Sequence, residues 1–378
     1  MSMDGTIGGR RMLSHVATTS VRNAGPGWFT SVMGTGILAI TLTLAPVELP
    51  LLAQLGRILF ALDVALFAAF IALWAIGLVM RPSSALESLA DPVRAQTWGA
   101  PPMACFTVAV DFLRIADSVM SPALCISIAQ VLFIAGVVLS LWSAFLVPFL
   151  MFTRHELNQE RAFGSWLLPV VPPIVASVPA ALLSPTWPEP LLASMLGMAY
   201  ALLGLGIALA AIIIVVFYTR LLFHKVPEGA LVPTMWIVVG PLGQSVAGII
   251  ALGIAAQDIW PHVGHGLFVA GVAFGLLVWG FGVYWLAMAL AVTIRAAFEK
   301  LPFTLGWWAF TFPVGTLTSG SYGLYAATHA AVFGVVGLAL LALLGTMWSL
   351  VAMHSLRAIG RTFDVRVENR STAMRIAA

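Results

Sequence analysis

Residues 191–219 read LLASMLGMAYALLGLGIALAAIIIVVFYT, a run of 29 residues without a charged side chain. About 20 consecutive apolar residues are enough for a helix to cross the hydrocarbon core of a bilayer. This stretch therefore predicts a transmembrane helix. The preceding segment, residues 165–183, reads SWLLPVVPPIVASVPAALL; it is also apolar but contains four prolines. Together the two segments indicate a membrane protein with two kinds of span, one smooth and one interrupted.

The composition of the whole chain supports this reading. Of the 378 residues, 61% are hydrophobic and only 9% are charged, whereas soluble domains carry roughly 25% charged residues. The chain has room for about ten spans and no independent soluble domain. We expect a cytoplasmic N-terminal segment (1–27), one transmembrane transport domain (28–356) and a basic cytoplasmic tail (357–378). The basic residues are scattered among short loops, so no nucleic-acid partner is expected.

The apolar runs predict an all-α membrane protein of ten transmembrane helices. Their approximate ranges are residues 28–46, 55–80, 101–118, 122–151, 165–183, 191–219, 232–256, 262–295, 304–328 and 329–356.

The positions of the basic residues indicate the orientation of these spans. With the N-terminus in the cytoplasm, sixteen of the 18 Lys and Arg residues fall on inside segments, and the outside loops hold none. Arg57 and Arg114 lie within or at the edge of spans. Positive charge concentrates on the cytoplasmic side of membrane proteins. The pattern therefore predicts ten spans in the plasma or inner membrane, with both termini cytoplasmic. The sixteen are Arg10, Arg11, Arg22, Arg81, Arg94, Arg154, Arg161, Arg220, Lys225, Arg295, Lys300, Arg357, Arg361, Arg366, Arg370 and Arg375.

Prolines concentrate in the odd-numbered spans. Proline kinks a helix and frees backbone carbonyls, which lipid tolerates only where protein or a water-filled cavity surrounds them. We therefore expect the odd spans to line a central path and the even spans to surround them, giving five helical hairpins around a pore. The alternative is that the prolines are scattered and merely kink individual helices.

Cysteine and histidine residues indicate no metal site, and no cofactor is expected. Cys105 and Cys125 fall near opposite membrane faces, too far apart for a disulfide. His262 and His265, one turn apart, are interpreted as interfacial residues because no cysteine or obvious carboxylate completes a ligand set.

Four stretches resemble the tellurite-resistance/dicarboxylate transporter family. They are Pro26-Gly-Trp-Phe29 followed by Val32-Met-Gly-Thr-Gly36, then Trp166-Leu-Leu-Pro-Val-Val-Pro-Pro173, Gly240-Pro-Leu-Gly-Gln-Ser245 and Trp307-Trp-Ala-Phe-Thr-Phe-Pro313. The family groups bacterial TehA, fungal malate permeases, sulfite efflux pumps and the slow anion channels of plant guard cells. The similarity runs from about residue 23 to residue 356.

The resemblance implies five helical hairpins around a pore, usually in a homotrimer, that passes small anions. It also implies a phenylalanine in the ninth span that plugs the pore, and the matching residue is Phe312. Phe310 lies two residues away, about 200° around a helix, and is expected to point elsewhere. The alternative for Phe312 is an ordinary core aromatic residue.

Other residues of the odd spans are candidates for the anion path, because broken helices offer free N–H groups and dipole ends to an anion. The alternative is that these small and hydroxyl side chains only permit close helix packing. Besides Phe312, the candidates are Gly34, Thr35, Gly36, Pro172, Pro173, Ser177, Gly243, Gln244, Ser245, Pro313 and Thr316.

Four charged residues fall within the predicted spans: Arg57, Asp63, Asp111 and Arg114. Charges inside a membrane are usually paired or functional. Asp63 and Arg114 are predicted at similar depth, which favours a structural ion pair between them. Alternatively, Asp63 or Asp111 carries a proton, or Arg114 binds the anion directly.

We therefore expect a membrane transporter or channel for small anions, such as the C4-dicarboxylate malate, or sulfite. A passive gated pore and a proton-coupled carrier that uses Asp63 and Asp111 both remain open. A membrane-embedded enzyme is disfavoured, because the sequence shows no nucleophile–base pair or metal cluster on any predicted helix.

Overall fold

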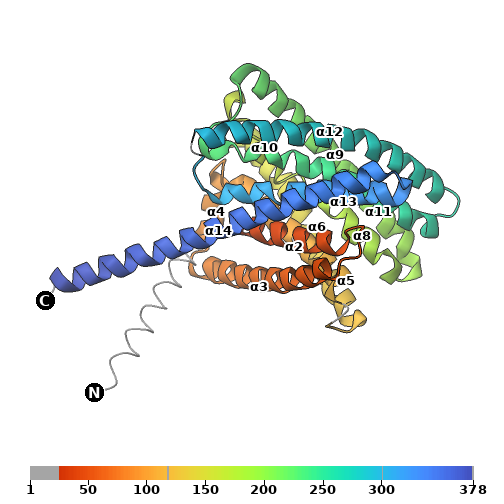
Figure 1. The fold of residues 1–378 in the computed structure, drawn as a ribbon, viewed down its shortest axis with the longest axis horizontal. Coiled ribbons are helices and arrows are strands. Elements are labelled where there is room, and N and C mark those ends of the chain that lie inside the picture. Colours follow the sequence, from red (N-terminus) through yellow and green to blue (C-terminus); the bar gives the residue numbers. More distant parts are fainter. Residues whose placement is uncertain (1–24, 117–118, 300, 377–378) are drawn as a thin grey trace.

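A computed structural model of the chain describes residues 25–116, 119–299 and 301–376 (Figure 1). Within these ranges the protein is all-helical and contains no strand, which confirms the predicted fold class. Residues 1–24 of the predicted N-terminal segment, the end of the span predicted over 101–118, Lys300 and the last two residues of the tail lie outside them. Cys105 and Cys125 are both buried and free, as predicted.

Each predicted span coincides with a helix or a broken helical segment. The smooth segments are single long helices: α3 (Pro50–Met80), α6 (Pro122–Thr153), α9 (Glu189–His224), α12 (Gly264–Phe298) and α14 (Ala331–Ile376). The proline-bearing segments are shorter or divided: α2 (Phe29–Thr43), α5 (Ala100–Arg114), α7 (Pro172–Val175) with α8 (Ser177–Leu183), α10 (Thr234–Ile237) with α11 (Val239–Ile259), and α13 (Phe312–Thr328).

Short 3-10 turns lead into the proline-bearing helices. They include η1 (Pro26–Trp28), η2 (Ala95–Gly99), η5 (Gly164–Leu167), η7 (Gly229–Leu231) and η8 (Leu305–Phe310). Six helical segments of the described part are long and apolar enough to cross a membrane: the five long helices and Gly229–Ile259. α2 and α5 have 15 residues each and are therefore about 22 Å long, shorter than a bilayer core of about 30 Å. The count of ten spans thus stays a prediction.

Burial separates the two kinds of helix. In the most apolar stretch of each of the five long helices, only 17% to 33% of the residues are buried, whereas 78% are buried in the Gly229–Ile259 segment. Nearly every residue of α2 and α5 is buried as well. The short or divided segments therefore lie inside the bundle, and the five long helices expose apolar side chains on its outside; one of them, α6, contains Pro148 as well.

The inner helices contact one another in a closed cycle. α2 contacts α5, α5 contacts α8, α8 contacts α11, α11 contacts α13, and α13 returns to α2. Each inner segment also packs against the long helix that follows it: α3 on α2, α6 on α5, α9 on α7 and α8, α12 on α11, and α14 on α13. The last part of α14 projects beyond the bundle (Figure 1).

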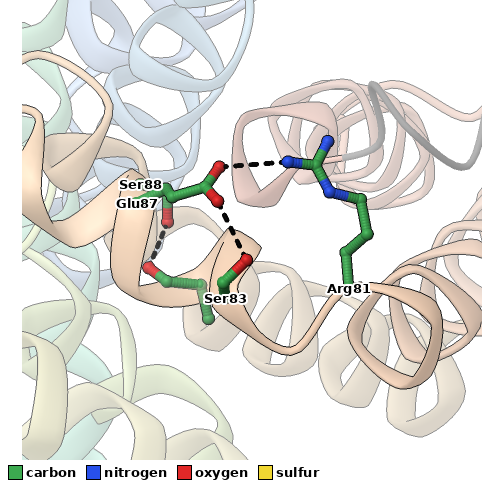
Figure 2. Close-up of polar contacts among 5 residues, drawn as sticks. Arg81, Ser83, Glu87 and Ser88 are labelled. Atoms are coloured by element: carbon green, nitrogen blue, oxygen red, sulfur yellow. Dashed lines mark hydrogen bonds and ion pairs between the residues drawn. The ribbon is translucent and has the colours of Figure 1, made fainter.

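A small polar cluster fixes the connection between α3 and the inner helix α5. Arg81, just after α3, pairs with Glu87 of α4 (Ser83–Ala90) at 3.4 Å, and the Ser83 hydroxyl donates to Glu87 at 2.9 Å (Figure 2). The indole of Trp98, in η2, donates to the Ser88 hydroxyl at 2.9 Å. These bonds hold η2, which leads into α5, against α4.

Candidate functional site

A cavity of about 310 Å³ lies where the N-terminal parts of the inner helices meet. Thr30 of α2, Met103 of α5, Gly240 and Pro241 of α11, and Phe312 of α13 all contribute to its wall. The rest of the lining comes mainly from the 3-10 turns that precede these helices. The cavity is therefore formed where the inner helices begin, next to the prolines and short turns that precede them.

The described residues that line the cavity include no charged side chain. Its threonine hydroxyls donate to nearby backbone carbonyls: Thr30 to Gly27, Thr97 to Arg94 and Thr234 to Leu231, each at 2.7 Å. Any favourable field for an anion would therefore come from the positive ends of the helix dipoles. The 3-10 turns already accept some of the first N–H groups, such as that of Ala100 by Thr97 and that of Thr311 by Trp308. Four helix starts around one apolar cavity form an arrangement suited to an anion.

Phe312 borders this cavity, and only 5% of it is exposed. It is the first residue of α13 and stands directly after Thr311 (φ −100°, ψ −71°), which separates η8 from α13. Phe310, before the break, packs edge-on against Trp236 with ring centroids 5.0 Å apart. The two phenylalanines thus point to different surroundings. The structure places Phe312 at the cavity wall and Phe310 in the adjoining aromatic core.

All four hydroxyl groups expected on the anion path are already hydrogen-bonded. Thr35 donates to the Ser31 carbonyl at 2.8 Å and accepts from Trp348 of α14 at 3.0 Å. Ser177 donates to Ile174 at 2.5 Å, and Ser245 donates to Pro241 at 2.6 Å. Thr316 donates to Pro313 at 2.7 Å, with Gly240 a second acceptor at 3.2 Å. None of these four residues borders the cavity.

The predicted glycines lie at close helix contacts. A methyl group on Gly34 would lie 2.2 Å from Thr311 Oγ1, and one on Gly243 would lie 2.3 Å from the Leu317 backbone nitrogen. Gly34, Gly36 and Gly243 do not border the cavity, and neither do Pro172, Pro173 and Gln244; of the predicted path residues only Phe312 and Pro313 do. The packing interpretation thus accounts for Gly34 and Gly243.

Asp63 and Asp111 meet at Gly36. A methyl group on Gly36 would lie 2.7 Å from Asp63 Oδ2 and 2.8 Å from Asp111 Oδ2. Both aspartates are fully buried, and none of their four carboxylate oxygens has a hydrogen-bond partner in the described part of the chain. Gly36 therefore makes room for two carboxyl groups at the junction of α2, α3 and α5.

The predicted ion pair between Asp63 and Arg114 is wrong. No salt bridge within 4.0 Å joins these residues in the described part of the chain, and the Arg114 side chain is exposed at the end of α5. Arg57 is also exposed, on α3. The prediction compared only the depths of the two residues in the membrane, and a similar depth does not mean that the two side chains point toward each other. Asp111, three residues before Arg114, is the residue of α5 that meets Asp63.

Most of the residues of the cavity wall are not among those predicted from the sequence. Thr30, Met33, Met103 and Thr234 all lie within a few residues after a proline that begins an inner segment. A place shortly after such a proline could have identified these residues from the sequence, because the inner helices begin around the common cavity. The position of Trp308 at the cavity could not be predicted from the sequence, because it depends on the 3-10 turn η8.

Comparison with known proteins covers the same region. Residues 23–356 match a family model described as SLAC1, voltage-dependent anion channel. A sulfite efflux pump of Arthroderma otae is 31% identical over 341 residues, which cover 88% of this chain and 90% of that protein. An uncharacterized transporter of Methanocaldococcus jannaschii is 29% identical over 343 residues, covering 89% and 93%. A malic acid transport protein of Schizosaccharomyces pombe is 23% identical over 294 residues, covering 76% and 67%. All of the inner helices lie within the matched range.

Proposed function

Because this chain belongs to the voltage-dependent anion channel family, the same group as the tellurite-resistance/dicarboxylate transporters, we propose that small anions cross the membrane along a path lined by its inner helices and closed by the Phe312 ring. The protein is a multi-pass membrane protein that transports anions and is not an enzyme. The relatives named for sulfite efflux and malic acid transport make sulfite and malate its candidate substrates.

The position of Phe312 carries this proposal. The ring borders a cavity at which four inner helices begin, and 5% of it is exposed. An aromatic ring across a narrow path excludes water and ions, and a small rotation rewets the path. Gly315, one turn further along α13, packs against Ile37 of α2. Because glycine has no side chain, α13 adds no bulk to this contact next to the ring.

The charge distribution supports a cytoplasmic position for the cavity. With ten spans and both termini inside, every inner helix would begin at the cytoplasmic face. The cavity lies at these helix starts, so it would open toward the cytoplasm. Arg94 and Arg161 stand in the connections that lead into α5 and α7. Such charges raise the local concentration of anions near the mouth of the path.

The lack of charged residues in the cavity wall favours singly charged anions. The cost of removing an ion from water rises steeply with its charge, and the lining offers no cation to offset it. Sulfite in its singly protonated form meets this condition better than doubly charged malate. Among the candidate substrates, hydrogensulfite is therefore preferred.

Purified protein in liposomes would test the proposal. Current and flux are measured for chloride, nitrate, sulfite and malate under an imposed membrane potential, at two external pH values. A current that follows the anion gradient at both pH values supports a passive pore. Absence of flux for all four anions, with protein shown to be inserted and folded, would refute the function.

Proton-coupled transport of the same anions is the second candidate, and one observation favours it. Asp63 and Asp111 bring two carboxyl groups together in the interior, where a shared proton would remove one of the two charges. In that case uptake of one anion follows the proton gradient rather than the membrane potential alone.

Assembly as a homotrimer belongs to the proposal as well, because the family resemblance implies one pore in each of three subunits. Native mass spectrometry of the protein in detergent distinguishes a trimer from a monomer. The lipid bilayer would cover the exposed apolar side chains that remain outside the subunit contacts.

A further inference from the structure

We propose that Gln244 of α11 and Ser319 of α13 form a second anion-coordination site, one to two helical turns beyond Phe312 along the path. This inference rests on the proposed function, because the site is reached only if anions pass the Phe312 ring. Neither residue lines the cavity described above, so the proposed site is separate from it.

The register of α13 places Ser319 on the same face as Phe312. Residues at i, i+4, i+7 and i+11 share one side of a helix, which here gives Phe312, Thr316, Ser319 and Gly323. With a rise of about 1.5 Å per residue, Ser319 lies about 10 Å beyond the ring along the helix axis. Ser319 therefore follows Phe312 on the side of α13 that turns toward the cavity.

Gln244 occupies the corresponding place on α11. It follows Gly240 by four residues and Pro241 by three, and both of those residues border the cavity. Contacts between the two helices fix its height. Gly243 packs on the Thr316–Leu317 backbone, and Gly320 packs on the Gly243 carbonyl. These contacts place Gln244 at the height of residues 316–320 of α13, the stretch that contains Ser319.

The hydrogen-bonding groups of these two side chains are free, as is the Tyr322 hydroxyl one turn beyond Ser319. Thr318 and Ser321 of the same helix donate to the carbonyls four residues before them, at 2.9 and 2.8 Å. The Ser319 hydroxyl is buried and has no partner in the described part of the chain. Gln244 is 5% exposed, and its amide likewise makes no hydrogen bond to described residues.

An unpaired buried hydroxyl such as that of Ser319 is unfavourable unless a ligand or water completes it. The Ser319 O–H and the two Gln244 N–H groups are donors, which suits an oxyanion such as sulfite. Asp63 and Asp111 meet instead at Gly36, at the junction with α3. Because neutral donors hold an anion less tightly than Arg or Lys, the ion can also leave, as conduction requires.

The test uses the full-length Phe312→Ala protein in liposomes, with sulfite and chloride as probes. Gln244→Leu keeps the approximate size of the side chain and removes its donors, so sulfite flux should fall about tenfold, the effect of losing one hydrogen bond to a charged group. Ser319→Ala should lower the flux less, and Gln244→Glu should nearly abolish it. The sulfite-to-chloride permeability ratio should fall in Gln244→Leu. Gln257→Leu, at the exposed end of α11, and Ser349→Ala, exposed on α14, are the matched controls.

A second measurement is independent of flux. With Cys105 and Cys125 replaced by alanine, Ser319→Cys should react with a negatively charged methanethiosulfonate reagent when Phe312 is alanine, and much more slowly when the ring is present. Unchanged flux and permeability ratio in both Gln244→Leu and Ser319→Ala would overturn the site, as would an unreactive Cys at position 319. If the Phe312→Ala parent passes no anion at all, the pathway itself fails and the site falls with it.

Discussion

The indole Nε1 of Trp348 donates a hydrogen bond of 3.0 Å to the hydroxyl of Thr35, which joins the last long helix, α14, to the first inner helix, α2. The two residues are 313 positions apart in the chain. α14 also packs on α13, which in turn contacts α2. The contact between α13 and α2 closes the cycle of inner helices, and the bond from α14 to α2 stabilises it.

Trp348→Phe should lower the stability of the protein without changing transport. The Thr35 hydroxyl keeps its bond to Ser31, so the loss is that of one hydrogen bond, about 1 kcal/mol. Thermal unfolding in detergent measures the loss, and a double-mutant cycle with Thr35→Val isolates the pair. Anion flux that rises in Trp348→Phe and falls in Thr35→Val would instead identify Thr35 as an anion ligand.

The sequence contained enough information to separate the two kinds of helix but not to orient their side chains. Prolines mark the inner segments because a broken backbone is costly in lipid, and the buried helices are indeed those that carry them. The length and apolar character of the outer helices are local properties, so their bounds were predicted to within about five residues, except that α14 continues to Ile376, well past the predicted end at residue 356.

Side-chain directions depend on contacts that the sequence does not reveal. The 200° rotation between Phe310 and Phe312 was predicted from an unbroken helix, whereas the structure separates them by a break at Thr311. Asp63 was expected to face Arg114, because depth was the only coordinate available, and it meets Asp111 instead. The partner of Thr35 could not be predicted, since Trp348 comes from the other end of the chain.

Phe312→Ala should raise anion flux about tenfold or more, because a barrier lower by about 1.4 kcal/mol is sufficient for that change. Phe310→Ala serves as the matched control two residues away. That substitution removes packing against Trp236 and should cost about 3–5 kcal/mol of stability without opening the path. Flux through liposomes and thermal unfolding are measured for both variants. Equal flux in Phe312→Ala and the parent protein would exclude the ring as the plug.

Gly243→Ala should destabilise the contact between α11 and α13. The added methyl group would lie 2.3 Å from the Leu317 nitrogen, a backbone atom that cannot move without shifting the helix. Overpacking of this kind costs about 1–3 kcal/mol. Gly280→Ala, on α12, is the control, because nothing lies within 4 Å of its added methyl group. It should leave the unfolding temperature unchanged or raise it slightly, since alanine favours a helix over glycine by up to about 1 kcal/mol.

Asp111→Asn tests whether the buried carboxyl pair serves structure or transport. The asparagine amide can donate to the Asp63 carboxylate and removes one of two adjacent acidic groups, so the unfolding temperature at neutral pH should equal or exceed that of the parent protein. Asp111→Ala should lower it, because the remaining carboxyl group then borders a void. Asp258→Asn, exposed at the end of α11, is the control and should change neither quantity.

Flux measurements on these three variants and on Asp63→Asn then separate the two transport candidates. A passive pore predicts that Asp111→Asn passes anions as the parent does at both pH values, because the pair lies between α2, α3 and α5 and only holds them together. A proton-coupled carrier predicts that the proton-driven part of the uptake disappears in Asp111→Asn and in Asp63→Asn, while passive leakage is unchanged. Loss of all flux in a folded Asp111→Asn protein would contradict the passive pore, which requires no charge at this position for an anion to move down its own gradient.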